Sequence, residues 1–232
     1  KMEVKEDKFN VFETLDMSKA IVESLGELDI DNFNNYMHKY VQMLKTFGKL
    51  IEIGFSDIDV KCKILKENQA KLAEKGEKVE TLEQLLETEI KLGLGNVNGS
   101  NNKKKGFDKT SEYYTHIGSC RSTERLLRFM LLLLRIIQNM ESNREESFSV
   151  CVRNAYDKEL SRYHSFFLRN TVKGIFYLLP SRETFLANIT NEWKDCTEEE
   201  LYEMIKELIV NLEQATDYVT KFLKDRDHFE LE

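Results

Sequence analysis

Hydrophobic residues recur along most of this chain at spacings of three and four positions, which is the period of an amphipathic α-helix. The pattern is clearest near the end, where seven apolar residues from Leu201 to Phe222 alternate between the two spacings. Thr197 and Glu200 precede them as a capping box, which places the start of a helix there. The same period predicts further helices over 11–25, 31–53, 57–71, 81–92, from 111–120 to just before 142, 149–160 and 164–179.

Few residues interrupt these helices. The chain has one proline and ten glycines in 232 residues, and no run of alternating apolar and polar residues indicates a strand. Pro180 ends the segment before it, and Ser181 can cap the turn that follows. The length is sufficient for a large hydrophobic core. We therefore predict a single all-α domain that spans residues 1–232.

One stretch lacks the helical period. Residues 93–106 are rich in glycine, asparagine and lysine, a composition typical of a flexible, exposed loop. Lys103 to Lys105 could contact an anionic lipid, but a solvated loop is the simpler interpretation. The segment is too short to mark a domain boundary, and we find no internal repeat.

A stripe of arginines distinguishes the helix expected to end near residue 142. At about 100° per residue, Arg121, Arg125, Arg128 and Arg135 fall within a sector about 80° wide, and most other positions around that helix are apolar. Because a guanidinium is costly to bury, this stripe requires anionic partners. The partners could come from the 41 acidic residues of the chain or from an anionic ligand, and both remain open.

A second set of charged residues has helical spacing. Asp59 and Lys63 are four residues apart, and Lys66 follows three residues later. Taken alone, this spacing indicates an exposed ion pair worth about 0.3 kcal/mol. The pair Arg121 and Arg125 has the same spacing and also needs anions. The two sets together favour a shared ligand site over a surface ion pair.

Charge and composition narrow the classes of partner and compartment. A formal charge of −7 argues against general nucleic-acid binding and against tight adhesion to an anionic membrane, both of which require a basic surface. The four cysteines are scattered without a CxxC motif, which fits a reducing compartment. We find no signal-peptide pattern, and the longest uncharged apolar run, Phe129 to Leu134, is far shorter than the roughly 20 residues that span a bilayer. These features predict a soluble cytoplasmic protein.

The sequence offers no motif for catalysis or metal binding. The four histidines have neither HxH nor HExxH spacing, so we expect no zinc site. Two DxD strings, 29–31 and 57–59, occur without a P-loop, GxGxxG or GxSxG motif, and such strings arise often by chance in acidic proteins. No nucleophile is paired with a base. We predict a protein that is not an enzyme and that binds no metal and no cofactor.

Four short segments resemble the glycolipid transfer protein family, and within it the branch that transfers ceramide 1-phosphate. They occur in the family's order and at compatible separations, and together they cover most of the chain from about residue 30 onward. The combination of the four makes the resemblance specific. In this sequence they read Asp59-Val-Lys-Cys-Lys-Ile-Leu-Lys66, Cys120-Arg-Ser-Thr-Glu-Arg-Leu-Leu-Arg128, Tyr163-His-Ser-Phe166 and Leu179-Pro-Ser-Arg-Glu-Thr-Phe185.

The resemblance implies a two-layer sandwich of about eight helices, with its core over residues 30–228. Such a fold holds one sphingolipid, with the headgroup at the surface and the chains in an apolar tunnel. Carried over by position, Asp59 would accept a hydrogen bond from the ceramide amide N–H, and His164 would donate one to the acyl carbonyl. An ionised carboxylate can only accept and a neutral imidazole can donate, so both roles suit the side chains.

The headgroup that the resemblance implies depends on two positions. In glycolipid-binding members an asparagine stands at the position of Lys63, and a tryptophan that stacks on a sugar stands at the position of Arg125. This chain has cations at both positions, so Lys63, Arg121 and Arg125 could bind a phosphate, with bidentate contacts from the arginines. Lys66 matches a lysine of the sugar-binding members, which leaves a mixed headgroup preference open.

The resemblance also suggests a membrane contact. Sugar-binding members often have a tryptophan at the position of Phe166, two residues after His164. An aromatic residue there could insert at a lipid interface, and a place in the core is the alternative. The resemblance assigns no role to Arg128 or Arg135, which we interpret as members of internal salt bridges.

Transfer of a phosphorylated sphingolipid between membranes is the leading hypothesis, with ceramide 1-phosphate favoured and with transient peripheral contact with the bilayer. Each buried methylene is worth about 0.8 kcal/mol, so a ceramide meets an aqueous barrier on the order of 20 kcal/mol that an apolar tunnel would lower. Two alternatives remain: transfer of a glycosylceramide, and a lipid-sensing adaptor that signals to a protein partner. An enzyme acting on phospholipid lacks a nucleophile and a metal site.

Overall fold

The computed structural model describes residues 9–45, 49–99, 101–190 and 196–231, and for 49–56 the backbone only. Within these ranges the chain has nine α-helices, three short 3-10 helices and no strand, as the periodicity predicts. The α-helices are α1 (Val11–Glu23), α2 (Ile30–Lys45), α3 (Lys49–Glu74), α4 (Leu82–Lys91), α5 (Ser119–Ser142), α6 (Phe148–Glu159), α7 (Phe166–Ile175), α8 (Arg182–Ile189) and α9 (Glu198–Lys224). The 3-10 helices are η1 (Asn102–Lys105), η2 (Ser161–Tyr163) and η3 (Phe176–Leu178).

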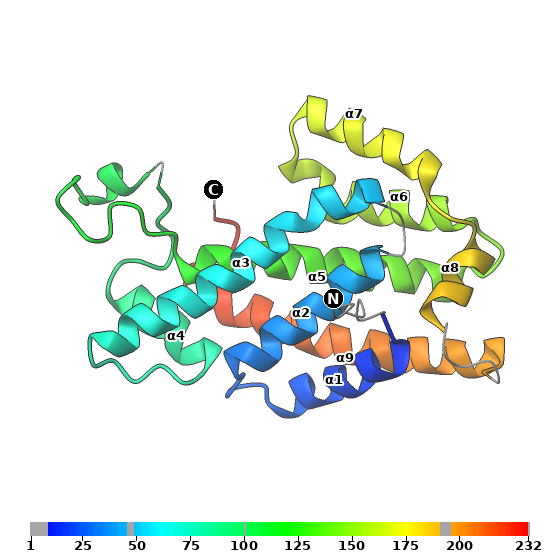
Figure 1. Cartoon of the computed structure of the whole chain (residues 1–232), viewed down its shortest axis with the longest axis horizontal. Coiled ribbons are helices and arrows are strands. Elements are labelled where there is room, and N and C mark those ends of the chain that lie inside the picture. The colour runs from blue at the N-terminus through cyan, green and yellow to red at the C-terminus, as the bar shows by residue number, and fades with distance from the viewer. Residues whose placement is uncertain (1–8, 46–48, 100, 191–195, 232) are drawn as a thin grey trace, which may run out of the picture.

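Helix α5 lies at the centre of a two-layer helical sandwich. It packs against α3, α4, α6 and α9, while α2 runs along α3 and α1 covers α9 and α2 (Figure 1). Most of the circumference of α5 is therefore buried, as its apolar composition requires. Helix α7 lies at the outside of the molecule, beyond α6, and contributes no fully buried residue.

The first turn of α5 is fixed by a buried carboxylate from α4. Glu89 is fully buried and accepts hydrogen bonds from the backbone N–H and the Oγ of Ser119, at 2.5 and 2.9 Å. The Nε2 atom of His116 lies 3.1 Å from the same carboxylate. A carboxylate at the amino end of a helix is stabilised by the helix dipole and by the free N–H groups there. This contact sets the position of the arginine-bearing helix relative to α4.

Helix caps lie where the sequence predicts them. Thr197 and Glu200 form a reciprocal capping box at the start of α9, with the Thr197 N–H donating to Glu200 over 2.8 Å. Ser181 caps α8, where its Oγ accepts from the N–H of Thr184 at 3.2 Å. The turn expected after Pro180 is thus an eight-residue helix, which raises the number of α-helices in the described ranges from about eight to nine.

The predicted boundary between the second and third helices is wrong. The sequence predicts helices over 31–53 and 57–71, but α2 ends at Lys45 and α3 already begins at Lys49. Residues 46–48 lie outside the described residues. Helix α3 includes Gly54, although a glycine inside a helix costs roughly 1 kcal/mol relative to alanine. The continuing apolar stripe of α3, buried at Ile58, Cys62, Leu65 and Leu72, outweighs that cost.

The expectation of an exposed loop over 93–106 is wrong for its inner side. Leu94 and Val97 are buried, and so is Asn102 within η1. The Nδ2 group of Asn102 donates to the carbonyls of residues 113, 114 and 116, at 2.9, 2.7 and 3.0 Å. One buried amide therefore joins this loop to the segment that leads into α5. A composition typical of loops does not reveal such an anchor.

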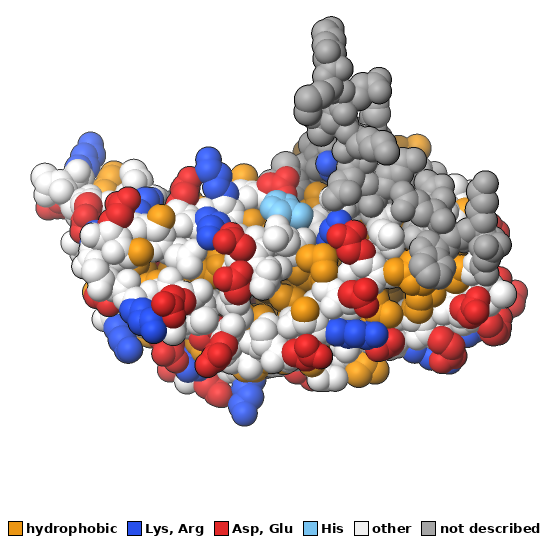
Figure 2. All heavy atoms as spheres, turned by 60° about the horizontal axis from the view of Figure 1, so that its bottom comes forward, with side chains coloured by type: hydrophobic (Ala, Val, Ile, Leu, Met, Phe, Trp, Pro, Cys, Tyr) orange, Lys and Arg blue, Asp and Glu red, His pale blue; other side chains and the backbone are white. Residues whose placement is uncertain are grey.

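The surface has charges of both signs. Acidic and basic side chains are interspersed with apolar ones on the face in Figure 2. None of the helices in the described parts of the chain has the length and hydropathy to cross a bilayer.

Arg182 joins α8 to the end of α5. Its guanidinium is buried and donates to the carbonyls of Met140 (2.9 Å), Asn143 (2.8 Å) and Glu146 (3.0 Å), and to the hydroxyl of Tyr202 (2.8 Å). The carbonyls at the end of a helix have no partners within the helix, so an external donor satisfies them. A single side chain thus connects α8, α5 and α9.

Replacing Arg182 with methionine should lower the free energy of unfolding by about 3 kcal/mol, because several buried acceptors lose their donor together. Urea unfolding followed by circular dichroism measures the effect. Arg144→Met is the matched control: Arg144 is partly exposed, stacks over Tyr202 at 3.9 Å and pairs with Glu199 at 3.3 Å. That control should cost less than about 1 kcal/mol. Equal losses in the two variants would contradict the role given to Arg182.

Candidate functional site

An apolar cavity of about 440 Å³ opens between α5, α6 and α7 and extends to the facing part of α3. This volume is in the range of small-molecule sites, which combine apolar walls with a few polar groups. Most of its lining is hydrophobic, from five helices and the segments around η2 and η3. The lining residues are Leu44, Asp57, Ile58, Arg125, Arg128, Phe129, Leu132, Ile136, Val152, Tyr156, Leu160, Tyr163, His164, Leu168, Val172, Ile175, Phe176 and Leu179.

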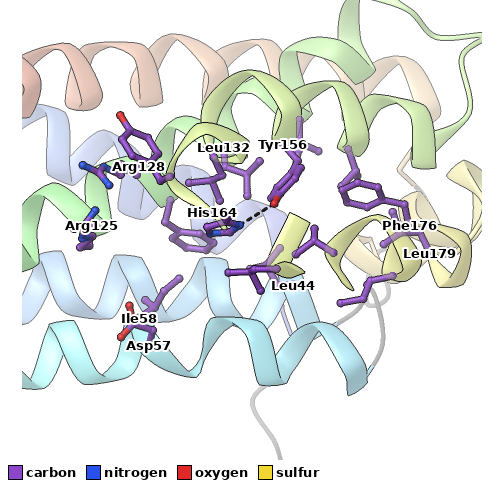
Figure 3. A pocket seen from close by; sticks show the side chains of 18 residues that line it. Leu44, Asp57, Ile58, Arg125, Arg128, Leu132, Tyr156, His164, Phe176 and Leu179 are labelled. Atoms are coloured by element: carbon purple, nitrogen blue, oxygen red, sulfur yellow. Dashed lines mark hydrogen bonds between the residues drawn. The ribbon is translucent and has the colours of Figure 1, made fainter. Parts of the chain in front are cut away.

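The polar and apolar parts of the cavity are segregated. Arg125, Arg128 and Asp57 lie at one end, whereas Phe176 and Leu179 lie at the other (Figure 3). The segregation follows from α5, which carries Arg121, Arg125 and Arg128 in its first half and a largely apolar surface beyond them. An elongated amphiphile with an anionic end therefore matches the cavity in both charge and polarity.

His164 lies between the two ends and is held by Tyr156. The Tyr156 hydroxyl is 2.8 Å from Nδ1 of His164, and the two rings are 5.5 Å apart between centroids (Figure 3). Burial lowers the pKa of His164 below its ordinary value of 6.5, so the neutral ring is the form present at pH 7. In the tautomer in which Nδ1 accepts from the hydroxyl, the proton resides on Nε2 and is free to donate to a ligand.

A buried carboxylate neutralises part of the arginine stripe. Glu124 accepts a hydrogen bond from Nε of Arg128 and forms an ion pair with Nη2 of the same residue, and its Oε2 lies 3.7 Å from Nη1 of Arg125. Burial raises the pKa of Glu124 to about 7, while the neighbouring Arg125 and Arg121 oppose that shift. Arg135 pairs with Glu159 at 3.1 Å. The expectation of internal salt bridges is therefore confirmed for Arg128 and Arg135.

Arg121 and Arg125 are left with less compensation than the other two arginines of the stripe. Burial and the neighbouring charge of Arg125 lower the pKa of Arg121, which still stays fully protonated near neutral pH. Arg125 is half-buried, and besides its distant contact with Glu124 it donates to the Leu231 carbonyl at 3.4 Å. Two adjacent cations that raise each other's energy form a site that favours an anion.

The guanidinium groups of Arg128 and Arg162 both lie against the ring of Tyr163. The Arg128 guanidinium lies 3.5 Å from the ring centroid of Tyr163, and that of Arg162 lies 4.6 Å from the same centroid. Arg162 in turn pairs with Glu230 at 3.2 Å. The positions of these cations at the polar end are therefore fixed by an aromatic ring that also lines the cavity.

The charged residues of α3 use partners that the spacing does not predict. Asp59 pairs with Nδ1 of His38 at 2.9 Å, and Lys63 lies 3.5 Å from Glu67. Lys66 pairs with Asp31 at 2.9 Å. The ion pair between Asp59 and Lys63 that the i,i+4 spacing allows is not among the interactions of the described residues. Asp59 and Lys63 are exposed on α3, with Lys63 held only by a long contact.

The structure thus brings together some of the predicted site residues and leaves others near the rim. Arg125 and His164 line the cavity itself. Asp59 follows the lining residues Asp57 and Ile58 on α3, and Lys63 lies one helical turn further on. Arg121 lies one turn before Arg125 on α5. Lys66 does not line the cavity and pairs with Asp31.

Aromatic side chains project from α7 into solvent. Phe166 is 75% exposed and Phe167 is 81% exposed, so the alternative that Phe166 belongs to the core is wrong. Tyr177 and Leu178, at the other end of the α7–η3 segment, are also exposed. Clustered large apolar groups on a surface indicate contact with another apolar phase.

Sequence reasoning missed several residues of the polar end. Tyr156 gives no signal in the sequence, because an aromatic residue on an apolar helix face is indistinguishable from a core residue, and Tyr163 belongs to a segment of the resemblance that assigned it no role. Glu124 does give one: it precedes Arg128 by four residues, the spacing of a helical ion pair. The contacts of Glu230 and His38 join segments far apart in the sequence, and no local pattern predicts them.

Comparison with known proteins places this geometry among lipid-binding relatives. The family model described as "Glycolipid transfer protein (GLTP)" matches residues 28–191. The ceramide-1-phosphate transfer protein of Xenopus tropicalis is 24% identical over 228 residues, covering 97% of this chain and 98% of that protein. Its namesake in Mus musculus is 23% identical over 231 residues, covering 99% and 100%. The crystal structure of the human ceramide-1-phosphate transfer protein with 12:0 ceramide-1-phosphate has a TM-score of 0.78 at 19% identity, covering 97% of this chain and 100% of that one.

The raised pKa of Glu124 predicts a pH dependence of stability. The folded state binds the proton more tightly than the unfolded chain, where the ordinary glutamate pKa of 4.5 applies. The free energy of unfolding should therefore fall, relative to a Glu124→Gln variant, as pH rises from about 4.5 to about 7, and then level off. Urea unfolding of both proteins across that range measures the difference. A difference that stays level across that range would mean that Glu124 remains ionised in the folded protein.

Proposed function

The chain belongs to the glycolipid transfer protein family, and on that premise we propose that it binds one phosphorylated sphingolipid, ceramide 1-phosphate in the first place, and carries it between membranes. The family consists of lipid transfer proteins and not of enzymes. In the proposed cycle no bond is made or broken. The protein offers the lipid chains an apolar environment in exchange for that of the bilayer, and so avoids the cost of exposing them to water.

The observation that carries this proposal is the segregated cavity. Its apolar part lies between α5, α6 and α7, and its polar end holds Arg125 together with Arg128. Arg128 is satisfied by Glu124, but Arg125 has only a long contact to Glu124 and a neutral carbonyl. A phosphate at this end would give Arg125 the charge-assisted partner that the protein itself does not supply.

In this proposal some of the predicted site residues contact the headgroup and others contact the ceramide backbone. Arg121 and Arg125 would bind the phosphate, and Lys63 on α3 would approach it with a flexible ammonium. His164, with its proton on Nε2, would donate to the acyl carbonyl. Asp59 would accept from the amide N–H with the carboxylate oxygen that His38 leaves unused.

A sugar headgroup fits this site less well. Sugar-binding members use a tryptophan as a stacking platform at the position of Arg125, and the aromatic ring that lies in this region, Tyr163, already has Arg128 on one face and Arg162 beside it. Lys66, the residue that matches the sugar-binding members, is engaged by Asp31. These contacts support phosphate over sugar as the headgroup.

Membrane contact would involve the exposed face of α7. Phe166 and Phe167 could enter the headgroup layer of a bilayer while the cavity beneath α7 receives the chains. The contact would be peripheral and transient. We place the protein in the cytosol, where thiols stay reduced, and all four of its cysteines are free thiols.

Arg125→Leu should lower the rate of ceramide 1-phosphate transfer between vesicles by more than about tenfold, because a hydrogen bond between charged groups is worth roughly 1.5–3 kcal/mol. Circular dichroism should show unchanged helicity, since Arg125 lies at the rim of the core. Arg153→Leu, an exposed arginine on α6, is the matched control and should transfer normally. The headgroup assignment fails if the variant transfers at the native rate, or if native protein moves galactosylceramide as fast as ceramide 1-phosphate.

Replacing both Phe166 and Phe167 with alanine should weaken binding to phosphatidylcholine vesicles by about tenfold or more, because each inserted ring contributes on the order of 1–2 kcal/mol. Sedimentation with vesicles measures this partition. Val210→Ala removes an apolar side chain that is half exposed on α9, away from α7, and should leave the partition unchanged. Equal binding by the double variant and native protein would assign the membrane contact to another surface.

A further inference from the structure

The segment that follows α9 contacts an arginine that lines the polar end of the cavity. We call residues 227–231 the strap. It rises from the end of α9 to the side of α5, as Figure 1 shows at the red end of the chain. The N–H groups of Asp227 and His228 donate to the carbonyls of Lys224 and Leu223, at 3.1 and 2.9 Å, and Phe229 lies against Lys224.

Beyond that point the strap contacts two arginines, Arg125 and Arg162. Arg125 on α5 donates to the Leu231 carbonyl at 3.4 Å. Arg162 on η2 pairs with the Glu230 carboxylate at 3.2 Å. Because Glu230 and Leu231 are consecutive, Arg162 and Arg125 lie close together. The strap therefore occupies the donors of a pair of cations, one of which lines the cavity.

Both attachments are weak. The contact to Leu231 is long and has a neutral acceptor, and the Arg162–Glu230 pair has its side chains 62% and 55% exposed. Exposed ion pairs are worth roughly 0–1 kcal/mol. Asp227 and Glu230 also have positive φ angles, 56° and 57°, which are unfavourable for glutamate and less so for aspartate. Phe229 and Leu231 are half-buried against the hydrophobic core, and the two contacts to arginines hold the Glu230 side chain and the Leu231 carbonyl.

We propose that Arg162 is a further headgroup-binding residue and that the strap competes with the lipid phosphate for it and for Arg125. An arriving phosphate takes Arg125 from the Leu231 carbonyl and offers it a charge-assisted bond instead. It takes Arg162 from Glu230 in the same way, and the strap detaches. This inference rests on the proposed function, because it requires a phosphate at Arg125.

Competition has a reciprocal consequence. If lipid binding releases the strap, then weakening the strap must strengthen lipid binding by the same free energy. A strap that was only structural, or that contributed contacts to the ligand, would have the opposite effect when weakened. The direction of the change in affinity therefore separates these roles.

Two variants and one control test the proposal. Glu230→Gln removes the competing charge and should tighten binding of ceramide 1-phosphate up to about fivefold. Arg162→Gln removes a headgroup cation and should weaken it about threefold or more. Asp227→Asn removes the same charge from an exposed position of the strap and tolerates a positive φ, so it should leave the affinity unchanged.

Hydrogen exchange of the backbone amides of residues 228–231 provides the second measurement. In native protein, exchange there should rise on addition of phosphatidylcholine vesicles that contain ceramide 1-phosphate. Vesicles that contain ceramide should not raise it, because ceramide lacks the phosphate. If ceramide also releases the strap, then the lipid chains and not the phosphate displace it, and the proposal is overturned.

The remaining outcomes separate this inference from the one on which it rests. Native protein that binds ceramide 1-phosphate without faster exchange in the strap, or binds it more weakly after Glu230→Gln, overturns the competition alone. Native protein that binds no ceramide 1-phosphate at all overturns both proposals. A charge reversal, Glu230→Lys, adds a further check, since it should tighten binding at least as much as Glu230→Gln.

Discussion

The cost of holding guanidinium groups at the edge of an apolar cavity governs how this molecule is arranged. Helix α5 is central and mostly buried, so each arginine of its stripe must find an acceptor or remain in reach of water. Arg128 and Arg135 are paired with Glu124 and Glu159, in contacts that the protein supplies by itself. Arg121 and Arg125 are not neutralised to the same degree. This difference is the physical basis of the proposed phosphate site at Arg121 and Arg125.

Neighbouring groups reinforce that difference. Tyr163 orders Arg128 and Arg162 on its ring, and Tyr156 holds the imidazole of His164. Each of these aromatic residues lies partly in the cavity wall and partly in a polar contact. The polar end is therefore preorganised, which lowers the entropic cost of binding a ligand there. Glu124 does not add to this preorganisation. Its pKa of about 7 means that its carboxylate, close to the proposed phosphate site, is only partly ionised at neutral pH.

Much of the fold was predictable from the sequence, because the apolar period of the helices and the caps at Thr197 and Ser181 are local signals. The boundary between α2 and α3 was predicted wrongly, because the apolar stripe of α3 outweighs the unfavourable helix propensity of Gly54. Arg125 and His164, two residues that the resemblance assigns to the site, line the cavity. The partners of Asp59 and Lys66, by contrast, come from α2, and the strap comes from the far end of the sequence. Such contacts depend on tertiary packing, which local spacing does not encode.

Helix α7 has no fully buried residue. Its inner side chains, Leu168, Val172 and Ile175, face the cavity, while Phe166 and Phe167 face outward. If a lipid occupies the cavity as proposed, its chains add to the partial packing that Val172 and Ile175 give this helix. The cargo would then be a removable part of the protein interior. The packing of the ten residues of α7 would then depend on whether a lipid is bound, and the same helix would contact the membrane. Release of the lipid would therefore loosen α7 while it contacts the acceptor bilayer.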